Sequence, residues 1–183
     1  MLKIAIFSAL ALFVFFFSLP WLRQPRSHGF YRFFGFEALL ALLYLNLENW
    51  FRDPLSVRQI ISWIVLLIAL WLVTQGLYQL VVQGKPKGYV ENTTNLVATG
   101  VYKYIRHPLY CSYILLGWGT FLKHPTNPEA GLPGLVLGLA LAHAVMFSMF
   151  YTAKAEEKEN IEKFGDSYRQ YMKATKRFVP RLY

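Results

Sequence analysis

Apolar segments of about 20 residues recur along this chain, which is the length that a helix needs to cross the roughly 30 Å hydrocarbon layer of a membrane. Hydrophobic residues make up 55% of the 183 residues and charged residues only 16%, a balance unlike that of a soluble domain. We therefore predict an all-α, polytopic membrane protein. We expect one domain over residues 1–183, with the first three spans in residues 1–82 and a cofactor-binding half in residues 83–183.

The apolar pattern predicts five membrane-spanning helices. They cover approximately residues 4–22, 33–51, 60–82, 108–122 and 132–153. A cleaved signal peptide is the competing interpretation of the first, but no small-residue cleavage site follows Phe17. The second carries Glu37, Asn46 and Glu48, and polar groups at that depth must face other helices or a wet cavity. Their roles are left open by the sequence.

The distribution of basic residues predicts the orientation of these helices. Five spans place the two termini on opposite sides, and lysine and arginine are enriched on the cytoplasmic side. On the side of the C-terminus fall fifteen of the 19 basic residues, and only Lys3, Arg52, Arg58 and Lys123 fall on the other. We therefore expect a cytoplasmic C-terminus. The net charge of +9 favours anionic lipid over nucleic acid as partner, because the basic residues flank apolar spans.

The chain beyond Ala153 is amphipathic. Apolar side chains recur there at spacings of three and four residues, and they are Ile161, Phe164, Tyr168, Tyr171 and Met172. This spacing predicts a helix that lies at the membrane interface.

Two polar clusters on the predicted cytoplasmic side could carry chemistry. Pro108 suits the first turn of a helix, so Arg106 and His107 should lie at the mouth of the bundle, where helix N-termini favour anions. Binding of lipid phosphates is the simpler alternative for these two residues. Glu156 and Glu157 follow the fifth span and could balance the basic pair, although adjacent glutamates are usually solvated.

The C-terminal half, residues 94–180, resembles the isoprenylcysteine carboxyl methyltransferase family, its prokaryotic relatives and phospholipid methyltransferases. The residues that carry the resemblance are Leu96, Val97, Gly100, Tyr102, Arg106, His107, Pro108 and Tyr110, followed by Glu156, Glu157, Phe164, Gly165, Tyr168, Tyr171 and Arg177 to Pro180.

The resemblance implies an integral membrane enzyme that transfers a methyl group from S-adenosylmethionine to a lipid-like acceptor, such as the carboxylate of an isoprenylated cysteine. It implies catalytic roles for Arg106 and His107. By the same resemblance the cofactor would contact Thr94, Asn95, Leu96, Val97, Tyr102, His107, Pro108, Leu109, Tyr110 and Glu156. An arginine that contacts the acceptor in the family is matched here by Thr152, with Lys154 as the nearest basic residue, so we expect these two at the acceptor.

Three alternatives remain open. A phosphatidylethanolamine N-methyltransferase would share the Arg-x-Pro and Glu-Glu pattern, and a sterol or enone reductase would share the tyrosines and proline near the C-terminus but bind NADPH. A scaffold or transporter subunit would bind neither cofactor. We expect no metal site, because the sequence has no paired His and Cys ligand spacing. The single cysteine, Cys111, fits a small apolar helix residue.

Overall fold

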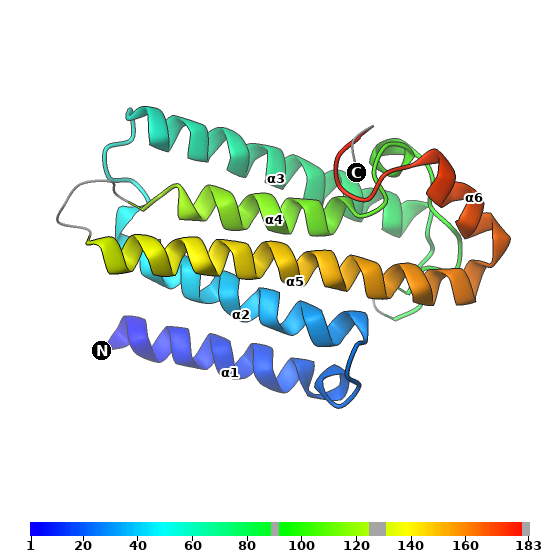
Figure 1. The fold of residues 1–183 in the computed structure, drawn as a ribbon, viewed down its shortest axis with the longest axis horizontal. Helices are drawn as coiled ribbons and strands as arrows, with labels where there is room; N and C mark the ends of the chain where they lie inside the picture. Colours follow the sequence, from blue (N-terminus) through cyan, green and yellow to red (C-terminus); the bar gives the residue numbers. More distant parts are fainter. Residues whose placement is uncertain (89–91, 125–130, 181–183) are drawn as a thin grey trace.

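The computed structural model describes residues 1–88, 92–124 and 131–180, and within these ranges the chain forms helices without a β-strand. The elements are α1 (Leu2–Leu22), α2 (His28–Asn46), η1 (Leu47–Asn49), α3 (Val57–Val82), η2 (Gly100–Lys103), α4 (Pro108–Phe121), α5 (Leu132–Phe164) and α6 (Asp166–Ala174). The five long helices lie side by side along one direction (Figure 1). The predicted all-α polytopic membrane fold is confirmed.

The bundle has two distinct ends (Figure 1). One end, which we call the connector end, holds residues 83–88 and 92–107, α6 and residues 175–180. The four basic residues that the sequence assigned to the non-cytoplasmic side lie at the opposite end; they are Lys3, Arg52, Arg58 and Lys123. These four basic residues are thus at the end of the bundle opposite the connector, as the predicted orientation of the helices requires. Which end faces the cytoplasm stays a prediction.

The fourth predicted span differs from the others. Four of the described helices are long and apolar enough to cross a membrane, namely α1, α2 with η1, α3 and α5. Helix α4 has only 14 residues, which corresponds to about 21 Å, less than the hydrocarbon thickness. None of its residues is exposed, because α3, α5 and α2 surround it. A helix enclosed by protein does not have to match the bilayer.

Helix boundaries follow local capping rather than hydropathy. The Ser27 side chain accepts a hydrogen bond from Phe30 N, and the Ser56 side chain accepts one from Gln59 N. A serine at this position satisfies a helix N–H that would otherwise lack a partner. Helix α2 therefore begins at His28 instead of residue 33, and its regular part ends at Asn46, before the predicted end at residue 51.

Helix α5 is longer than its apolar part. It continues without interruption past Ala153 to Phe164, for 33 residues, or about 50 Å. The chain has no glycine or proline from Ala153 to Phe164 to stop it, and Gly165 then adopts a φ of 59°, which favours glycine. The tail expected to lie at the interface is therefore two pieces, the last turns of α5 and the short helix α6.

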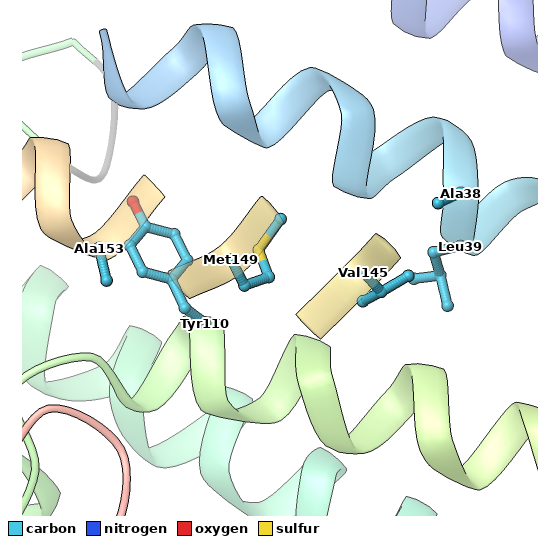
Figure 2. Packing of buried hydrophobic residues seen from close by; sticks show 6 residues of the cluster. All are labelled: Ala38, Leu39, Tyr110, Val145, Met149 and Ala153. Carbon is cyan, nitrogen blue, oxygen red and sulfur yellow. The ribbon is translucent and has the colours of Figure 1, made fainter. Parts of the chain in front are cut away.

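The core lies where α2, α4 and α5 meet. Figure 2 shows Ala38 and Leu39 of α2 near Val145, and Tyr110 of α4 beside Met149 and Ala153 of α5. Val145, Met149 and Ala153 are fully buried. Their spacing of four residues continues along α5 to Glu157, so the same packing places Glu157 next to the start of α4.

Candidate active site

The connector is the chain between α3 and α4, described at residues 83–88 and 92–107. It folds back on the end of α3. The backbone N–H groups of Thr94 and Asn95 donate to the carbonyl of Gly84, at 2.8 and 3.1 Å. Gly100 has a φ of 57°, and a Cβ there would collide with the side chain of Gln79. A larger residue would therefore strain the turn that leads into η2, where Tyr102 is buried.

Residues 175–180, which we call the C-terminal segment, form backbone hydrogen bonds with the end of the connector. The N–H of Arg106 donates to the Lys176 carbonyl at 2.7 Å, and the N–H of His107 donates to the Arg177 carbonyl at 3.2 Å. Tyr171 of α6 adds a hydrogen bond from its hydroxyl to the Tyr102 carbonyl at 2.7 Å. The end of the chain thus closes over the start of α4.

Glu157 is the centre of a buried ion-pair cluster. Its Oε1 accepts hydrogen bonds from Arg106 Nε at 2.9 Å and Arg177 Nε at 3.1 Å, and its Oε2 lies 2.5 Å from Arg177 Nη2. The side chains of Glu157 and Arg106 are only 5% and 8% exposed. Arg106 also donates to the carbonyls of Met172 and Thr175. Arg106, expected to act in catalysis, therefore holds α5, α6 and the connector together.

Glu156 points to a different partner. Its Oε2 lies 3.5 Å from Nδ1 of His107, and the Tyr110 hydroxyl also bonds to it. His107 is buried and its ring stacks on Tyr110. The His107 Nε2 lies 3.4 Å from Glu157 without the geometry of a hydrogen bond.

The glutamates set the protonation of His107. Burial by itself would lower the pKa of this imidazole, but the close negative charges of Glu156 and Glu157 outweigh it, so the pKa is raised. Burial likewise would raise the pKa of Glu156, yet the contacts with His107 and Tyr110 hold it well below its usual value. His107 directly precedes α4, and Glu156 lies beyond the apolar part of α5. These interactions favour the imidazolium form of His107 and the carboxylate form of Glu156.

A cavity of about 60 Å³, which we call the connector cavity, lies between the connector, the start of α4, α5 and α6. Eight predicted site residues line it: Leu96, Val97, Tyr102, Arg106, His107, Leu109, Tyr110 and Glu156. The other residues that line it were not predicted as site residues; they are Leu80, Thr93, Asn160, Phe164, Tyr168 and Tyr171. Asn160 lies one helical turn after Glu156, so the spacing of four residues was the available signal.

The other predicted site residues lie elsewhere. The Thr94 hydroxyl and the Asn95 amide bond to backbone carbonyls at the end of α3, and Pro108 is buried in the first turn of α4. Thr152 is fully buried and its hydroxyl donates to the Ser148 carbonyl at 2.7 Å, whereas Lys154 is exposed. None of these side chains is among those that line the connector cavity.

A larger cavity of about 500 Å³ lies beside the first, between α1, α2 and α5. We call it the α2 cavity. Its wall consists of Phe17, Trp21, His28, Arg32, Phe36, Asn92, Glu156, Glu159, Asn160 and Lys163. Glu156 and Asn160 therefore line both cavities and form a shared wall between them. The residues from α1 and α2 were not expected at the site, because that half of the chain carries no motif.

Comparison with known proteins gives relatives with one activity. A methanethiol S-methyltransferase of Pseudomonas deceptionensis is 30% identical over 82 residues, which are 45% of this chain and 27% of that protein. One from Crocosphaera subtropica is 24% identical over 172 residues, which are 86% of this chain and 62% of that protein. Methanethiol S-methyltransferase 1 of Bradyrhizobium diazoefficiens is 30% identical over 81 residues, which are 44% of this chain and 24% of that protein.

The chain thus spans less than two thirds of the length of these curated relatives. No solved structure matches it. A family described as a protein of unknown function, DUF1295, matches residues 18–175, which include all of the connector, α4 and α5. The resemblance inferred from the sequence motifs is thereby confirmed. The chain belongs to this DUF1295 family, which is isoprenylcysteine carboxyl methyltransferase-like.

Proposed function

We propose that this protein is a membrane methyltransferase that uses S-adenosylmethionine and methylates a small lipophilic thiol. The observation that carries the proposal is the shared wall at Glu156 and Asn160. It separates a polar, aromatic cavity suited to the cofactor from a larger cavity suited to an acceptor. A transferase needs this arrangement, because two reactants must meet in a fixed orientation.

The side chains of the connector cavity fit the chemistry of the cofactor. Glu156 offers a carboxylate for an ammonium group or for ribose hydroxyls, and His107 offers positive charge for a carboxylate. Tyr102 and Tyr110 offer aromatic faces on which adenine could stack. The connector cavity alone is smaller than the usual range of about 300 to 1,000 Å³ for ligand sites, but the two cavities together fall within it. We therefore expect the cofactor to extend along the shared wall.

The protein's own part in the reaction is to hold the two reactants, to orient them and to exclude water. When bound, the cofactor supplies an activated methyl group on a positively charged sulfur, which passes to the acceptor sulfur while the electron pair of the broken bond stays on the donor. The buried Glu157 cluster fixes the connector and the C-terminal segment over the site. An acceptor thiol must first lose its proton, because the thiolate is the nucleophilic form.

The relatives support a thiol acceptor over the isoprenylated cysteine carboxylate, since all three are named for methanethiol. No arginine occupies position 152, where the family resemblance implies a contact with that carboxylate. We expect the connector end to face the cytoplasm, so that the cofactor enters from there.

The test uses purified protein in lipid nanodiscs. S-adenosylhomocysteine should bind in a calorimetric titration, NADPH should not, and labelled methyl groups should pass to butanethiol. Glu156→Gln should weaken S-adenosylhomocysteine binding about ten-fold, the loss expected for one charge-assisted hydrogen bond. Glu162→Gln, a matched change on the exposed face of α5, is the control. Binding of NADPH alone would contradict the proposal and favour a reductase.

The acceptor is decided by parallel assays. We expect faster transfer to butanethiol than to a farnesylated cysteine acid or to phosphatidylethanolamine. Transfer to either of these two lipids in preference to the thiol would keep the methyltransferase but overturn its acceptor.

A further inference from the structure

We propose that a membrane phospholipid with the headgroup chemistry of phosphatidylethanolamine binds between α1 and α2, at the end of the bundle opposite the connector. One acyl chain occupies a cavity there, Lys3 binds the phosphate, and Glu48 binds the ammonium of the headgroup. The site shares no lining residue with the connector cavity or the α2 cavity. The inference therefore does not rest on the proposed function, and the bound lipid is not the methyl acceptor.

The chain site is a cavity of about 470 Å³, which we call the α1 cavity. Helix α1 packs on α2 at one edge of the bundle (Figure 1), and the cavity lies between the first turns of α1 and the last turns of α2. Of the described residues that line it, all but Lys3 are aliphatic or aromatic. Its volume lies within the range of about 300 to 1,000 Å³ for small-molecule sites. An apolar space of this size suits a hydrocarbon chain.

Ring contacts hold the wall of the α1 cavity in shape. Phe7 of α1 and Tyr44 of α2 have ring centres 4.7 Å apart and join the two helices. Trp50 and Phe51 pack on Trp63 of α3, with ring centres 6.1 and 5.9 Å apart. A cavity that is already formed binds a chain at a lower cost in conformational entropy than a surface that must rearrange.

The α1 cavity is also open to the bilayer. Ile6 and Leu10 of α1 and Leu47 of η1 line it and are about half exposed. The two helices that form it, α1 and α2 with η1, are both long and apolar enough to cross a membrane. An acyl chain can therefore enter sideways from the bilayer without crossing water.

Two opposite charges stand where the α1 cavity ends. Lys3 lies in the first turn of α1 and Glu48 in η1, directly after α2, so both are at the ends of their membrane helices, where headgroups lie. Lys3 Nζ lies 2.5 Å from Glu48 Oε1, and the two side chains are 57% and 78% exposed. This contact uses one of the three N–H donors of the ammonium and one oxygen of the carboxylate. The pair therefore presents further donors beside further acceptors.

A phosphatidylethanolamine headgroup carries the complementary pair of charges. Its phosphate accepts hydrogen bonds from Lys3, and its ammonium donates to Glu48, so each charge lies next to its opposite. Phosphatidylglycerol has the phosphate without the cation, and its negative charge is repelled by Glu48. Phosphatidylcholine has a cation without an N–H to donate. The two side chains together thus favour phosphatidylethanolamine over both.

The experiment measures lipid binding to the purified protein in detergent by native mass spectrometry, with these three lipids carrying identical acyl chains. The parent should bind its first phosphatidylethanolamine about three- to five-fold more tightly than either other lipid, the difference expected for an exposed charge contact. Glu48→Gln should remove most of the preference over phosphatidylglycerol. Lys3→Gln should weaken the binding of all three lipids, because each has the phosphate.

Asp53→Asn is the matched control. It removes the same charge from an exposed position at the same end of the bundle, outside the α1 cavity, and asparagine tolerates the positive φ of 49° at that position. It should change the preference by less than about two-fold. Ile6→Trp, which narrows the α1 cavity, should weaken all three lipids to the same extent.

A phosphatidylethanolamine with a photoreactive group in its acyl chain locates the site. It should label the first turns of α1 and residues 40–51, and labelling confined to other helices would overturn the proposed cavity. Equal affinity of the parent for the three lipids would overturn the headgroup assignment, as would an equal change of preference in Glu48→Gln and Asp53→Asn. If Glu48→Gln does not fold, the preference of the parent and the photolabelling decide.

S-adenosylhomocysteine titrations on the same samples separate this inference from the proposed function. Lipid preference and labelling as expected, without cofactor binding, would overturn the proposed function alone. Cofactor binding together with no lipid preference would overturn the lipid site alone.

Discussion

Both ends of the bundle bury charged side chains, but they do so in different surroundings. At the connector end, Glu157 and Arg106 form ion pairs beside a cavity that Glu156 and His107 also line. At the opposite end, Lys123 is fully buried and donates to the Gln59 Oε1 at 2.8 Å.

Aromatic rings enclose the charge at that second end. The Lys123 ammonium lies 3.5 Å from the Trp63 ring centre and 5.4 Å from that of Trp50. Gln59 is in turn fixed by donating to the Asn49 carbonyl at 2.9 Å. Lys123 lines neither the connector cavity nor the α2 cavity.

The comparison shows that a buried charge by itself does not identify a site. Lys123 and Glu157 are both held by several contacts that stabilise the fold. What distinguishes the connector end is that several polar side chains line its cavities, whereas the wall of the α1 cavity, of about 470 Å³ at the opposite end, is apolar and aromatic apart from Lys3. Substitutions at the two ends should therefore separate stability from cofactor binding.

The largest effect should come from Glu157→Gln. The change leaves the buried Arg106 and His107 side chains and the partly buried Arg177 without their shared carboxylate, which costs about 3 to 5 kcal/mol for a broken buried ion pair. Thermal unfolding in detergent should show the loss. A small change in unfolding temperature would instead fit the solvated glutamate pair that the sequence left open.

Lys123→Met should have the next largest effect. It removes the cation–π contacts and leaves the Gln59 Oε1 without its donor, which together cost about 2 kcal/mol. Methyl transfer and S-adenosylhomocysteine affinity, measured below the unfolding temperature, should match those of the parent. A loss of affinity in this variant would mean that the two ends are coupled.

The pH dependence of stability should report the connector end. The raised pKa of His107 contributes stability that is present below about pH 6.5 and is lost as pH rises through the folded pKa. The lowered pKa values of Glu156 and Glu157 contribute above about pH 4.5 and are lost as pH falls through the folded values. The free energy of unfolding should therefore be highest between about pH 4.5 and pH 6.5 and decline at lower and at higher pH.

His107→Gln checks that assignment. The variant should lose the alkaline decline in unfolding temperature, whereas Lys123→Met should keep it. An unchanged alkaline limb in His107→Gln would assign that titration to another group.

The smallest effect is expected from Lys154→Gln. The side chain is exposed on α5 and lines neither cavity. The free energy of unfolding should therefore stay within about 0.5 kcal/mol of the parent, as for other surface substitutions, and the KM for the thiol within about two-fold. A large rise in KM would show that Lys154 reaches the acceptor, as expected of the basic residue nearest to Thr152.

The sequence by itself determined the fold class and most of the connector cavity. Apolar runs of membrane length predict helices without knowledge of their neighbours, because the lipid imposes the same requirement on each of them. Residues such as Tyr102, His107 and Glu156 were found because they belong to a local motif. The exposed surface of the long helices also follows from composition alone.

Only the tertiary structure decided which side chains meet across helices. That the Glu157 carboxylate pairs with both Arg106 and Arg177 depends on how α5 is rotated against the connector and the C-terminal segment, because adjacent residues on a helix point about 100° apart. The short length of α4 is tolerated because its neighbours enclose it. Arg32 reaches the site through the packing of α2 on α5, a contact between residues far apart in the chain that no local pattern encodes.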